Sequence, residues 1–237
     1  MADLQPLPLA AIAPIAPITG DQVTGCVLAG GRATRMGGVD KGLQPFNGQP
    51  LALQALQRLA PQVGPLLINA NRHLDLYTAL GEPFDAQIYA DPLPDYPGPL
   101  AGFLAGLTHC KTPWLLCIPC DTPLFPSDLL ARMGHAYAQA GEQADIIIAH
   151  GLDTERAEPG QPAEMRAQPV FCLLKASLKD SLADFITSGG RKIDRWTAQH
   201  RPIAAVFDRP EDAQAFSNAN TLAQLHDLEQ AIPHAKP

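Results

Sequence analysis

Short apolar runs alternate with longer amphipathic segments along most of this chain. Seven apolar runs, bounded by glycine, proline or polar residues, predict buried strands at residues 23–29, 65–70, 86–90, 114–118, 145–149, 170–174 and 203–207. Segments with helical spacing of their apolar residues lie near 51–62, 99–110, 127–140, 176–188 and 221–231. Strands that alternate with helices of this length pair in parallel, because each parallel connection needs a crossover. We therefore expect an α/β fold with three layers around a mostly parallel central sheet.

The first part of the chain does not follow this pattern. Residues 1–22 include the proline- and alanine-rich stretch "LQPLPLAAIAPIAPITG", which has neither a helical nor a strand period. We predict a flexible tail there and a single domain at residues 23–237, because a chain of 237 residues can bury one sizeable core. A second irregular stretch, from Asp153 to Gln168, combines prolines, glycines and charges and predicts a loop over one edge of the sheet.

The net charge argues against two classes of partner. The chain carries 17 lysine and arginine residues against 24 aspartate and glutamate residues, for a formal net charge of −7. Nucleic acids and anionic membranes attract basic proteins, so we expect neither as a partner. No apolar stretch reaches the roughly 20 residues that a membrane span needs. The first residues contain Asp3 but no basic region, so we expect no secretory signal peptide.

The cysteines predict a reducing compartment. There are five of them, without the spacing of a disulfide framework, which favours a cytoplasmic location. Cys117 and Cys120 form a lone C-x-x-C, but no second pair or histidine lies at zinc spacing from them. We therefore interpret them as two thiols of an apolar strand rather than as a redox or metal site.

A glycine-rich stretch with three cations follows the first predicted strand. It reads "LAGGRATRMGGVDKGL" from Leu28 to Leu43 and contains Arg32, Arg35 and Lys41. Its glycines can turn backbone N–H groups toward an anion. Arg35 offers a planar fork of donors and Lys41 a mobile point charge, so the stretch predicts a polyphosphate site. It is neither a Walker A motif nor a G-x-G-x-x-G fingerprint, and a glycine-rich turn with solvated basic residues is the alternative.

Polar residues also lie at or just after the ends of the next three predicted strands. They are Asn69, Asp91 and Asp121, and in a parallel sheet these strand ends share one edge, where ligands bind. Asp121 could hold Mg²⁺, which prefers one or two carboxylates plus phosphate oxygens. For both aspartates a role in a turn is the alternative. The stretch "YPGPLAG", from Tyr96 to Gly102, suits a loop beneath a base or ribose, or a plain loop that leads into a helix.

Two stretches near the C-terminus are open to two interpretations each. "SGGRKIDRW" contains Arg191 and Lys192, which form either a second anion site or the solvated basic end of a helix. "FSNANT" contains Asn218 and Asn220, of which one is a helix N-cap or both face a ligand.

The motifs together resemble those of a known family. "LAGGRATRMGGVDKGL" is similar to the signature L-A-G-G-x-x-x-R-M-G-G-x-D-K-x-L of the molybdenum cofactor guanylyltransferases. The resemblance continues in "INANR", "DYPGPLAG" and "PCDTP", and more weakly in "GRK" and "NANT", so it spans about residues 23–222. It implies a Rossmann-like nucleotidyltransferase fold. It also implies a reaction in which GMP is transferred from GTP to the terminal phosphate of Mo-molybdopterin, with Mg²⁺ and with release of pyrophosphate.

The resemblance also implies roles for individual residues. Nucleotide contacts would come from Leu28, Ala29, Gly30, Gly31, Gly38, Lys41, Asn69, Asp91 and Asp121, with Asn69 and Asp91 on the guanosine. The catalytic residues would be Arg35 and Lys41, which hold phosphates, and Asp121, which binds magnesium as well as nucleotide. The pterin substrate would be received by Arg191, Lys192, Asn218 and Asn220.

The implied partners are GTP and Mo-molybdopterin, with proteins that deliver molybdopterin or accept the product as further partners. The protein would act as a monomer or a weak oligomer. Two alternatives remain open: a nucleotidyltransferase that uses CTP on the same pterin or acts on a sugar phosphate, and a nucleotide-sensing or cofactor-carrying protein without catalysis. A Rossmann oxidoreductase is disfavoured by the missing fingerprint.

Overall fold

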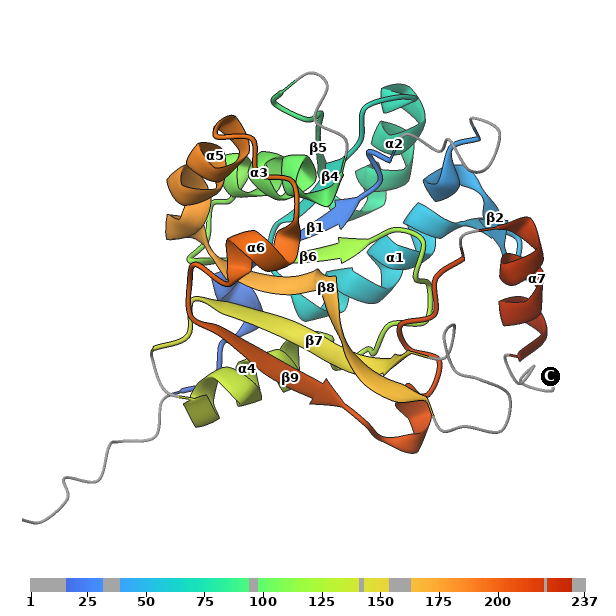
Figure 1. Ribbon diagram of the computed structural model, residues 1–237. Helices are drawn as coiled ribbons and strands as arrows, with labels where there is room; N and C mark the ends of the chain where they lie inside the picture. Colours follow the sequence, from blue (N-terminus) through green and yellow to red (C-terminus); the bar gives the residue numbers. More distant parts are fainter. Residues whose placement is uncertain are drawn as a thin grey trace, which may run out of the picture.

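The computed structural model describes residues 16–31, 39–93, 98–140, 143–153, 163–219 and 221–231 (Figure 1). Its strands are β1 (Val23–Leu28), β2 (Pro45–Phe46), β3 (Gln49–Pro50), β4 (Leu66–Asn69), β5 (Gln87–Tyr89), β6 (Trp114–Pro119), β7 (Ile146–Asp153), β8 (Glu164–Lys175) and β9 (Pro202–Phe207). Its α-helices are α1 (Leu51–Leu59), α2 (Leu74–Gly81), α3 (Pro99–His109), α4 (Leu129–Ala140), α5 (Lys179–Thr187), α6 (Ile193–Thr197) and α7 (Leu222–Ala231). Two of the 3-10 turns, η3 (Lys41–Leu43) and η7 (Pro210–Asp212), contain residues of the ion pairs described below.

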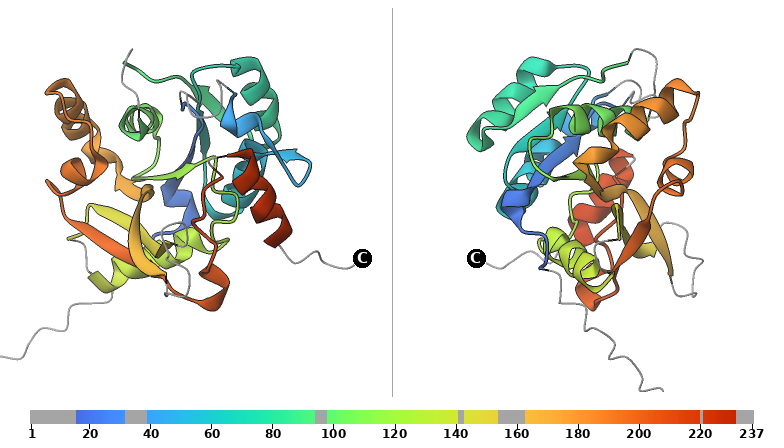
Figure 2. Two further views of the ribbon diagram at one scale, coloured as in Figure 1. Left: turned by 45° about the vertical axis from the view of Figure 1, so that its right-hand side comes forward. Right: turned by 90° about the vertical axis from the view of Figure 1, so that its left-hand side faces the viewer.

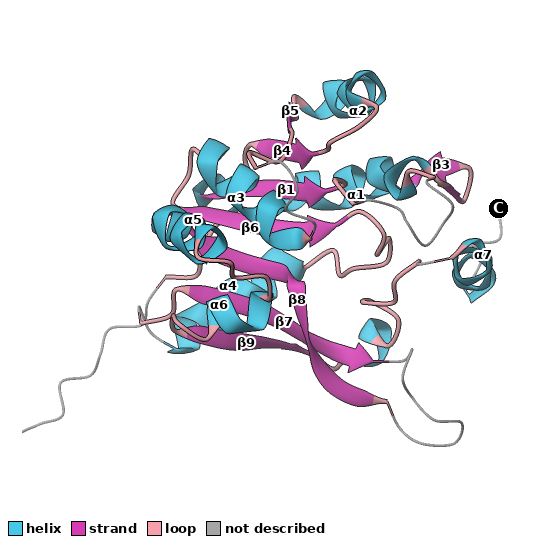
Figure 3. Ribbon diagram, turned by 45° about the horizontal axis from the view of Figure 1, so that its top comes forward, coloured by secondary structure: helices cyan, strands magenta, loops and turns pink. Residues whose placement is uncertain are grey.

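Seven strands form the central sheet, in the order β5-β4-β1-β6-β8-β7-β9. Strand β8 runs antiparallel to its neighbours β6 and β7, and the other pairs of this sheet are parallel. Figure 3 shows that β4, β1 and β6 point toward the same edge. The predicted α/β class and mostly parallel sheet are confirmed, and each predicted strand overlaps a strand of this sheet.

Helices cover both faces of the sheet, which confirms the predicted three layers (Figure 2). Successive side chains of a strand point to opposite faces. In β1, Val27 belongs to the apolar cluster that contains residues of α1 and α4. Its neighbour Cys26 belongs to the cluster on the other face, which contains residues of α3, α5 and α6. The amphipathic spacing read from the sequence is therefore the spacing of residues that face the sheet.

The C-terminal helix α7 packs beside the β2–β3 hairpin, far from it in sequence (Figure 1). Phe46 of the hairpin shares a small apolar cluster with Leu225 and Leu228. The Asn47 N–H also donates to Glu229 Oε1 at 2.6 Å. The last part of the chain thus returns to the N-terminal half of the domain.

The hairpin, α2 and α6 had no counterpart among the predicted elements. Strands of two residues and a helix of five are too short to show a period. Helix α2 is longer, but Leu74 and Leu76 are 45% and 48% exposed. Its apolar residues therefore do not form the single stripe by which an amphipathic helix is recognised.

The predicted loop from Asp153 to Gln168 is wrong at both ends. Strand β7 reaches Asp153 and β8 begins at Glu164, and these two residues pair in an antiparallel register. Prolines and charges suggested a loop, but the charged side chains lie on the exposed part of β8, where they do not oppose strand formation. The register shifts after Ile148, opposite the part of β8 that contains Pro169, which lacks an N–H for the ladder. Residues 154–162 lie outside the described part of the chain.

Packing begins before the predicted start of the domain at Val23. Ile18 is only 6% exposed and belongs to the apolar cluster of α1 and α4. Residues Gly20–Gln22 form a 3-10 turn, preceded by Thr19 as N-cap in a capping box. The predicted tail boundary at residue 22 therefore lies too late for this stretch. Residues 1–15 lie outside the described part, and the division into a tail and one domain otherwise stays a prediction.

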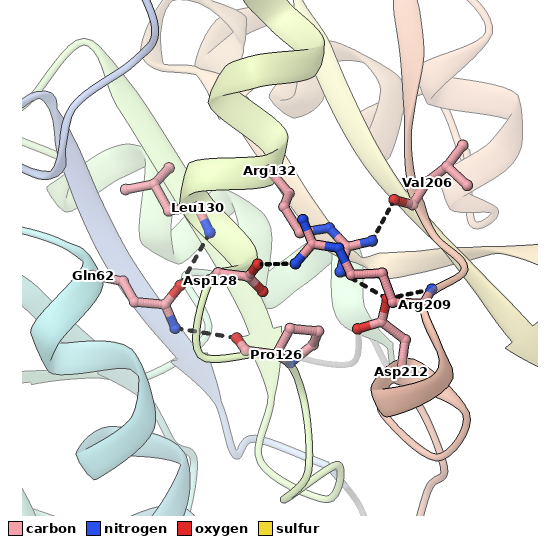
Figure 4. Close-up of polar contacts among 8 residues, drawn as sticks. All are labelled: Gln62, Pro126, Asp128, Leu130, Arg132, Val206, Arg209 and Asp212. Atoms are coloured by element: carbon pink, nitrogen blue, oxygen red, sulfur yellow. Dashed lines mark hydrogen bonds and ion pairs between the residues drawn. The ribbon is translucent and has the colours of Figure 1, made fainter.

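A buried ion pair joins α4 to the segment that follows β9 (Figure 4). The Arg132 guanidinium donates to Asp212 Oδ2 at 2.7 Å and to the Val206 carbonyl oxygen at 2.8 Å. It also lies over the Phe207 ring, 4.0 Å from the centroid. The Arg132 and Asp212 side chains are only 12% and 3% exposed. The Arg209 N–H donates to the same Asp212 oxygen at 3.0 Å, so turn η7 is held from two sides.

A second network of ion pairs makes the stability of the fold depend on pH in the acidic range. Asp145 accepts two hydrogen bonds of 2.8 Å from Arg201 and one of 3.0 Å from Lys175. The Arg201 hydrogen bonds lower the pKa of Asp145 from 3.8 to about 2. Because the pKa of Asp145 is lower in the folded protein than in the unfolded chain, its ionised form stabilises the fold at pH values above the pKa of the unfolded chain. That contribution is lost as the pH falls toward 2.

Replacing Asp145 with asparagine is therefore expected to lower the free energy of unfolding at pH 7 by about 1 kcal/mol, a modest value because Arg201 is exposed. The difference from the natural protein should shrink between pH 4 and pH 2, which urea unfolding at several pH values measures. The matched control is Asp180→Asn, since Asp180 is 89% exposed in its pair with Lys179. A pH-independent difference would contradict the assignment.

Candidate active site

The carboxyl ends of β1, β4 and β6 meet at one edge of the sheet. Leu28 pairs with Asn69 on one side and with Pro119 on the other. The Ala29 N–H donates to the Asn69 carbonyl oxygen at 2.8 Å, and the Cys120 N–H to the Leu28 carbonyl oxygen at 3.1 Å. Residues after these three strands are therefore brought together, as the sequence predicts. This edge is the candidate active site.

Lys41 and Asp121, which are 80 positions apart in the chain, form an ion pair at this edge. Their Nζ and Oδ2 atoms are 3.1 Å apart. Asp121 is the second residue after β6, whereas Lys41 lies on turn η3. The side chains are 24% and 19% exposed, so both can be reached from solvent. The structure thus brings together a cation and a carboxylate that the sequence predicts to act on one polyphosphate.

Asn69 and Asp91, the two residues predicted to bind guanosine, contact each other directly. Asn69 is 3% exposed, and its Nδ2 donates to Asp91 Oδ1 at 2.9 Å and to the Tyr89 carbonyl oxygen at 3.2 Å. These bonds fix the Asn69 amide and leave its Oδ1 directed toward Gly30 and Gly102. The two candidate residues therefore act as one hydrogen-bonded unit.

Asn71, which lies in "INANR" among the polar groups expected at this edge but had no predicted role of its own, also belongs to this unit. Its Nδ2 donates to Asp91 Oδ2 at 2.7 Å and to the Gly30 carbonyl oxygen at 3.0 Å, and its Oδ1 accepts from the Asp91 N–H at 2.8 Å. Asn71 thereby connects the loop after β1 to the loop after β5 through hydrogen bonds. A signal was present in "INANR", because residues two apart at a strand end face the same side.

Two residues at this edge have to be glycine, because asparagine side chains approach their Cα atoms closely. A Cβ at Gly30 would lie 2.7 Å from Asn71 Nδ2, and a Cβ at Gly102 would lie 2.6 Å from Asn69 Oδ1. Both distances are too short for a real side chain, so the asparagines reach their positions only because these residues are glycine. A Cβ at Gly31 would meet no described atom within 4 Å. The predicted role of the Gly31 backbone toward a ligand stays a prediction.

On the C-terminal side, the structure brings Asn218 to the site. Asn218 Oδ1 accepts from the Thr122 hydroxyl at 2.8 Å, and the Ala219 N–H donates to the Asp121 carbonyl oxygen at 2.8 Å. The segment before α7 therefore lies directly beside Asp121. Thr122, which also had no predicted role of its own, is fully buried.

Arg191 and Lys192 are placed differently. Both are exposed and lie between α5 and α6, on the face of the sheet that α3 also covers. The Arg191 guanidinium donates to the Gly190 carbonyl oxygen at 3.2 Å. Their prediction as pterin ligands stays open. Arg35, Gly38 and Asn220 lie outside the described residues.

The two cysteines of the C-x-x-C motif face opposite sides of the sheet. Cys117 belongs to the cluster with α3 and α5, and Cys120 to the cluster with α1 and α4. Both are free and buried, and burial raises the pKa of each thiol above its usual range. Both thiols lie among apolar side chains, as predicted, although Cys120 lies just after the end of β6 rather than in the strand. Among the described residues, no group of three or more histidine, cysteine or acidic side chains could hold a metal ion.

Comparison with known proteins identifies the family. The chain matches the MobA-like NTP transferase domain over residues 25–203. It is 56% identical over 208 residues to the molybdenum cofactor guanylyltransferase of Acidovorax ebreus (strain TPSY), an alignment of 87% of this chain and 95% of that protein. The protein of the same name from Ralstonia nicotianae is 53% identical over 211 residues, which are 89% of this chain and 98% of the relative.

A solved structure agrees in fold. Molybdopterin-guanine dinucleotide biosynthesis protein A from Archaeoglobus fulgidus superposes with a TM-score of 0.66 at 21% identity, over 87% of this chain and 97% of its own. The fold and the domain match together define a nucleotidyltransferase. Within that class, the chain belongs to the molybdenum cofactor guanylyltransferase family. In the described part of the chain, no helix combines the length and the apolar character needed to cross a bilayer.

Proposed function

We propose that the protein transfers GMP from GTP to the terminal phosphate of Mo-molybdopterin, which gives Mo-molybdopterin guanine dinucleotide and pyrophosphate. The observation that carries the proposal is the pairing of Lys41 with Asp121, 3.1 Å apart at the carboxyl edge of the sheet. This pair lies in a chain that is 56% identical to a molybdenum cofactor guanylyltransferase. The pair supports a site in which Lys41 would bind phosphate and Asp121 would bind the metal ion.

The nucleotide would lie along this edge. The backbone of Leu28, Ala29, Gly30 and Gly31 would approach it, with Arg35 and Lys41 on the phosphates and Gly38 in the loop between them. Asn69 and Asp91 would bind the guanosine part. The hydrogen bonds that hold Asn69 and Asp91 to each other support this role, because they orient both groups before a ligand arrives.

The donor set at the edge suits Mg²⁺. Asp121 supplies one carboxylate, and Mg²⁺ commonly takes one or two carboxylates, with phosphate oxygens and water as its other ligands. When bound, the ion would neutralise part of the negative charge on the triphosphate. For this ion to bind Asp121 Oδ2, Lys41 has to release that oxygen, and the phosphates offer Lys41 a replacement partner.

The proposed reaction needs no general base. A phosphate monoester has its second pKa near ~6, so the attacking oxygen of molybdopterin is already mostly ionised at pH 7. The barrier comes instead from bringing two polyanions together, which costs several kcal/mol in a site of low dielectric unless the charge is neutralised. Lys41, Arg35 and the backbone N–H groups would supply positive charge, and their fixed positions would align the two phosphates.

The pterin substrate would enter from the C-terminal side. Asn218 beside Asp121 supports this, and we assign Arg191, Lys192 and Asn220 to the same substrate. Proteins that deliver molybdopterin or accept the product would be further partners, and the protein would act as a monomer or weak oligomer. The five free cysteines support a cytoplasmic location.

The test is release of pyrophosphate from GTP, CTP or UTP with Mg²⁺, each with and without Mo-molybdopterin. We expect release from GTP alone among the three, and only when Mo-molybdopterin is present. Release from CTP instead would identify a cytidylyltransferase. Nucleotide binding without any release would support a sensing or carrier protein and would contradict the proposed reaction.

A further inference from the structure

A buried tyrosine contacts the residue next to Lys41. The Tyr77 hydroxyl donates to Asp40 Oδ1 at 2.6 Å. Tyr77 lies on α2 and is fully buried, and Asp40 is 7% exposed. A carboxylate this deeply buried needs a hydrogen-bond donor, because burial without one is costly. Burial raises the pKa of Tyr77 above its usual range, so the hydroxyl keeps the proton that it donates.

Tyr77 also shapes the turn that carries Lys41. A Cβ at Gly42 would overlap the Tyr77 hydroxyl oxygen, so this oxygen lies directly against the turn backbone. The turn is closed by the Leu43 N–H, which donates to the Asp40 carbonyl oxygen at 3.3 Å. The Gln44 side-chain amide donates through Nε2 to the same oxygen at 3.1 Å. The turn is thus held on the side that faces α2, and Lys41 extends from it to Asp121.

The side chains of Asp40 and Lys41 have different partners in different parts of the fold. Asp40 is joined to α2, which packs beside β5 at the edge of the sheet. Lys41 is joined to the end of β6. A shift of the Asp40 carboxylate would move the neighbouring Lys41 Cα, and with it the ammonium group. The Tyr77 hydroxyl thus contacts the turn from which the Lys41 side chain extends.

We propose that Tyr77, acting through Asp40, is a positioning residue that sets where the Lys41 ammonium lies relative to Asp121 and the triphosphate. The inference rests on the proposed function. It gives α2 a part in the reaction, although Tyr77 would contact no substrate. A hydroxyl that only stabilised the packing of α2 would affect folding in the same way but would not act through Lys41.

The test is a double-mutant cycle on pyrophosphate release from GTP and Mo-molybdopterin. Tyr77→Phe removes only the hydroxyl and is expected to lower kcat/KM roughly 10-fold, since displacements of under 1 Å at a reacting group have effects of this size. In a Lys41→Met background, the same change should lower kcat/KM no further. Its effect on the thermal midpoint should be equal in both backgrounds. Asp40→Asn keeps an acceptor for Tyr77 and enters the same cycle if Tyr77→Phe fails to fold.

The matched control is Tyr137→Phe. Tyr137 packs edge-on against Trp114 at the amino-terminal end of β6, whereas Asp121 lies beyond the carboxyl end of that strand. Removing the Tyr137 hydroxyl should therefore leave kcat/KM unchanged. Unchanged kcat/KM in Tyr77→Phe, or an equal fall in both backgrounds, would overturn the inference. If the natural protein itself released no pyrophosphate, the proposed function would fail instead, so the two failures are distinguishable.

Discussion

Asp121→Ala is expected to lower turnover by about 100-fold or more, because a positioned charge of this kind contributes on the order of 3 kcal/mol to the stability of a transition state. Lys41→Ala should have an effect of similar size. In the proposed mechanism, Asp121 would bind the metal ion and Lys41 would bind the phosphates, so the loss of either leaves charge in the transition state less well neutralised. Pyrophosphate release at saturating GTP and Mo-molybdopterin measures the loss.

The fold should survive both changes. Asp121 and Lys41 are each about a fifth exposed, so removing either leaves no deeply buried charge without a partner. Thermal unfolding followed by circular dichroism checks this, and Asp180→Ala, at an 89% exposed position, controls for loss of a carboxylate elsewhere. Near-normal turnover in Asp121→Ala or Lys41→Ala would remove that residue from the mechanism.

Arg132→Leu is expected to lower the free energy of unfolding by about 3–5 kcal/mol, because it leaves the Asp212 carboxylate buried without its charged partner. The change also removes the bond to the Val206 carbonyl oxygen and the contact with the Phe207 ring. Urea unfolding measures the loss. An effect below that of a typical exposed pair, about 1 kcal/mol, would contradict the view that this network is buried.

The chain offers a matched control for this network. Arg209 Nη1 lies 3.0 Å from Asp128 Oδ2, but these side chains are 52% and 42% exposed. Arg209→Leu should therefore cost less than about 1 kcal/mol. Removing both Arg132 and Asp212 should cost less than the sum of the two single changes, since no buried charge then remains.

Most of the sheet could be predicted from the sequence because its strands are apolar and short. Val27 and Cys26 face opposite sides of β1, and both sides are covered by helices, so the run reads as continuously apolar. The same reasoning failed at Glu164–Gln168, where β8 leaves the covered part of the sheet and its side chains are mostly exposed. Only backbone pairing with β7 makes that part a strand.

The candidate site was partly predictable for the same reason. Asn69 ends an apolar strand, and Asp91 and Asp121 each lie two residues after one. Because neighbouring parallel strands end at one edge of the sheet, these residues are expected to lie close together. Asn71 carried a weak signal next to Asn69. Nothing in the sequence pointed to Tyr77. It lies in a helix without a clear apolar stripe, and no local pattern indicates which distant carboxylate the Tyr77 hydroxyl contacts.

By itself, the sequence determined the class of fold, the edge of the sheet at which we propose that the chemistry occurs, and the residue types available there. These depend on hydrophobic period and on motifs, which are local properties of the chain. Only the tertiary structure decided that Lys41 meets Asp121, that Asp40 is buried under Tyr77, and that Arg132 is paired with Asp212. Each of these contacts joins residues 37 to 80 positions apart. Their geometry depends on how helices pack on the sheet, and no local pattern records that.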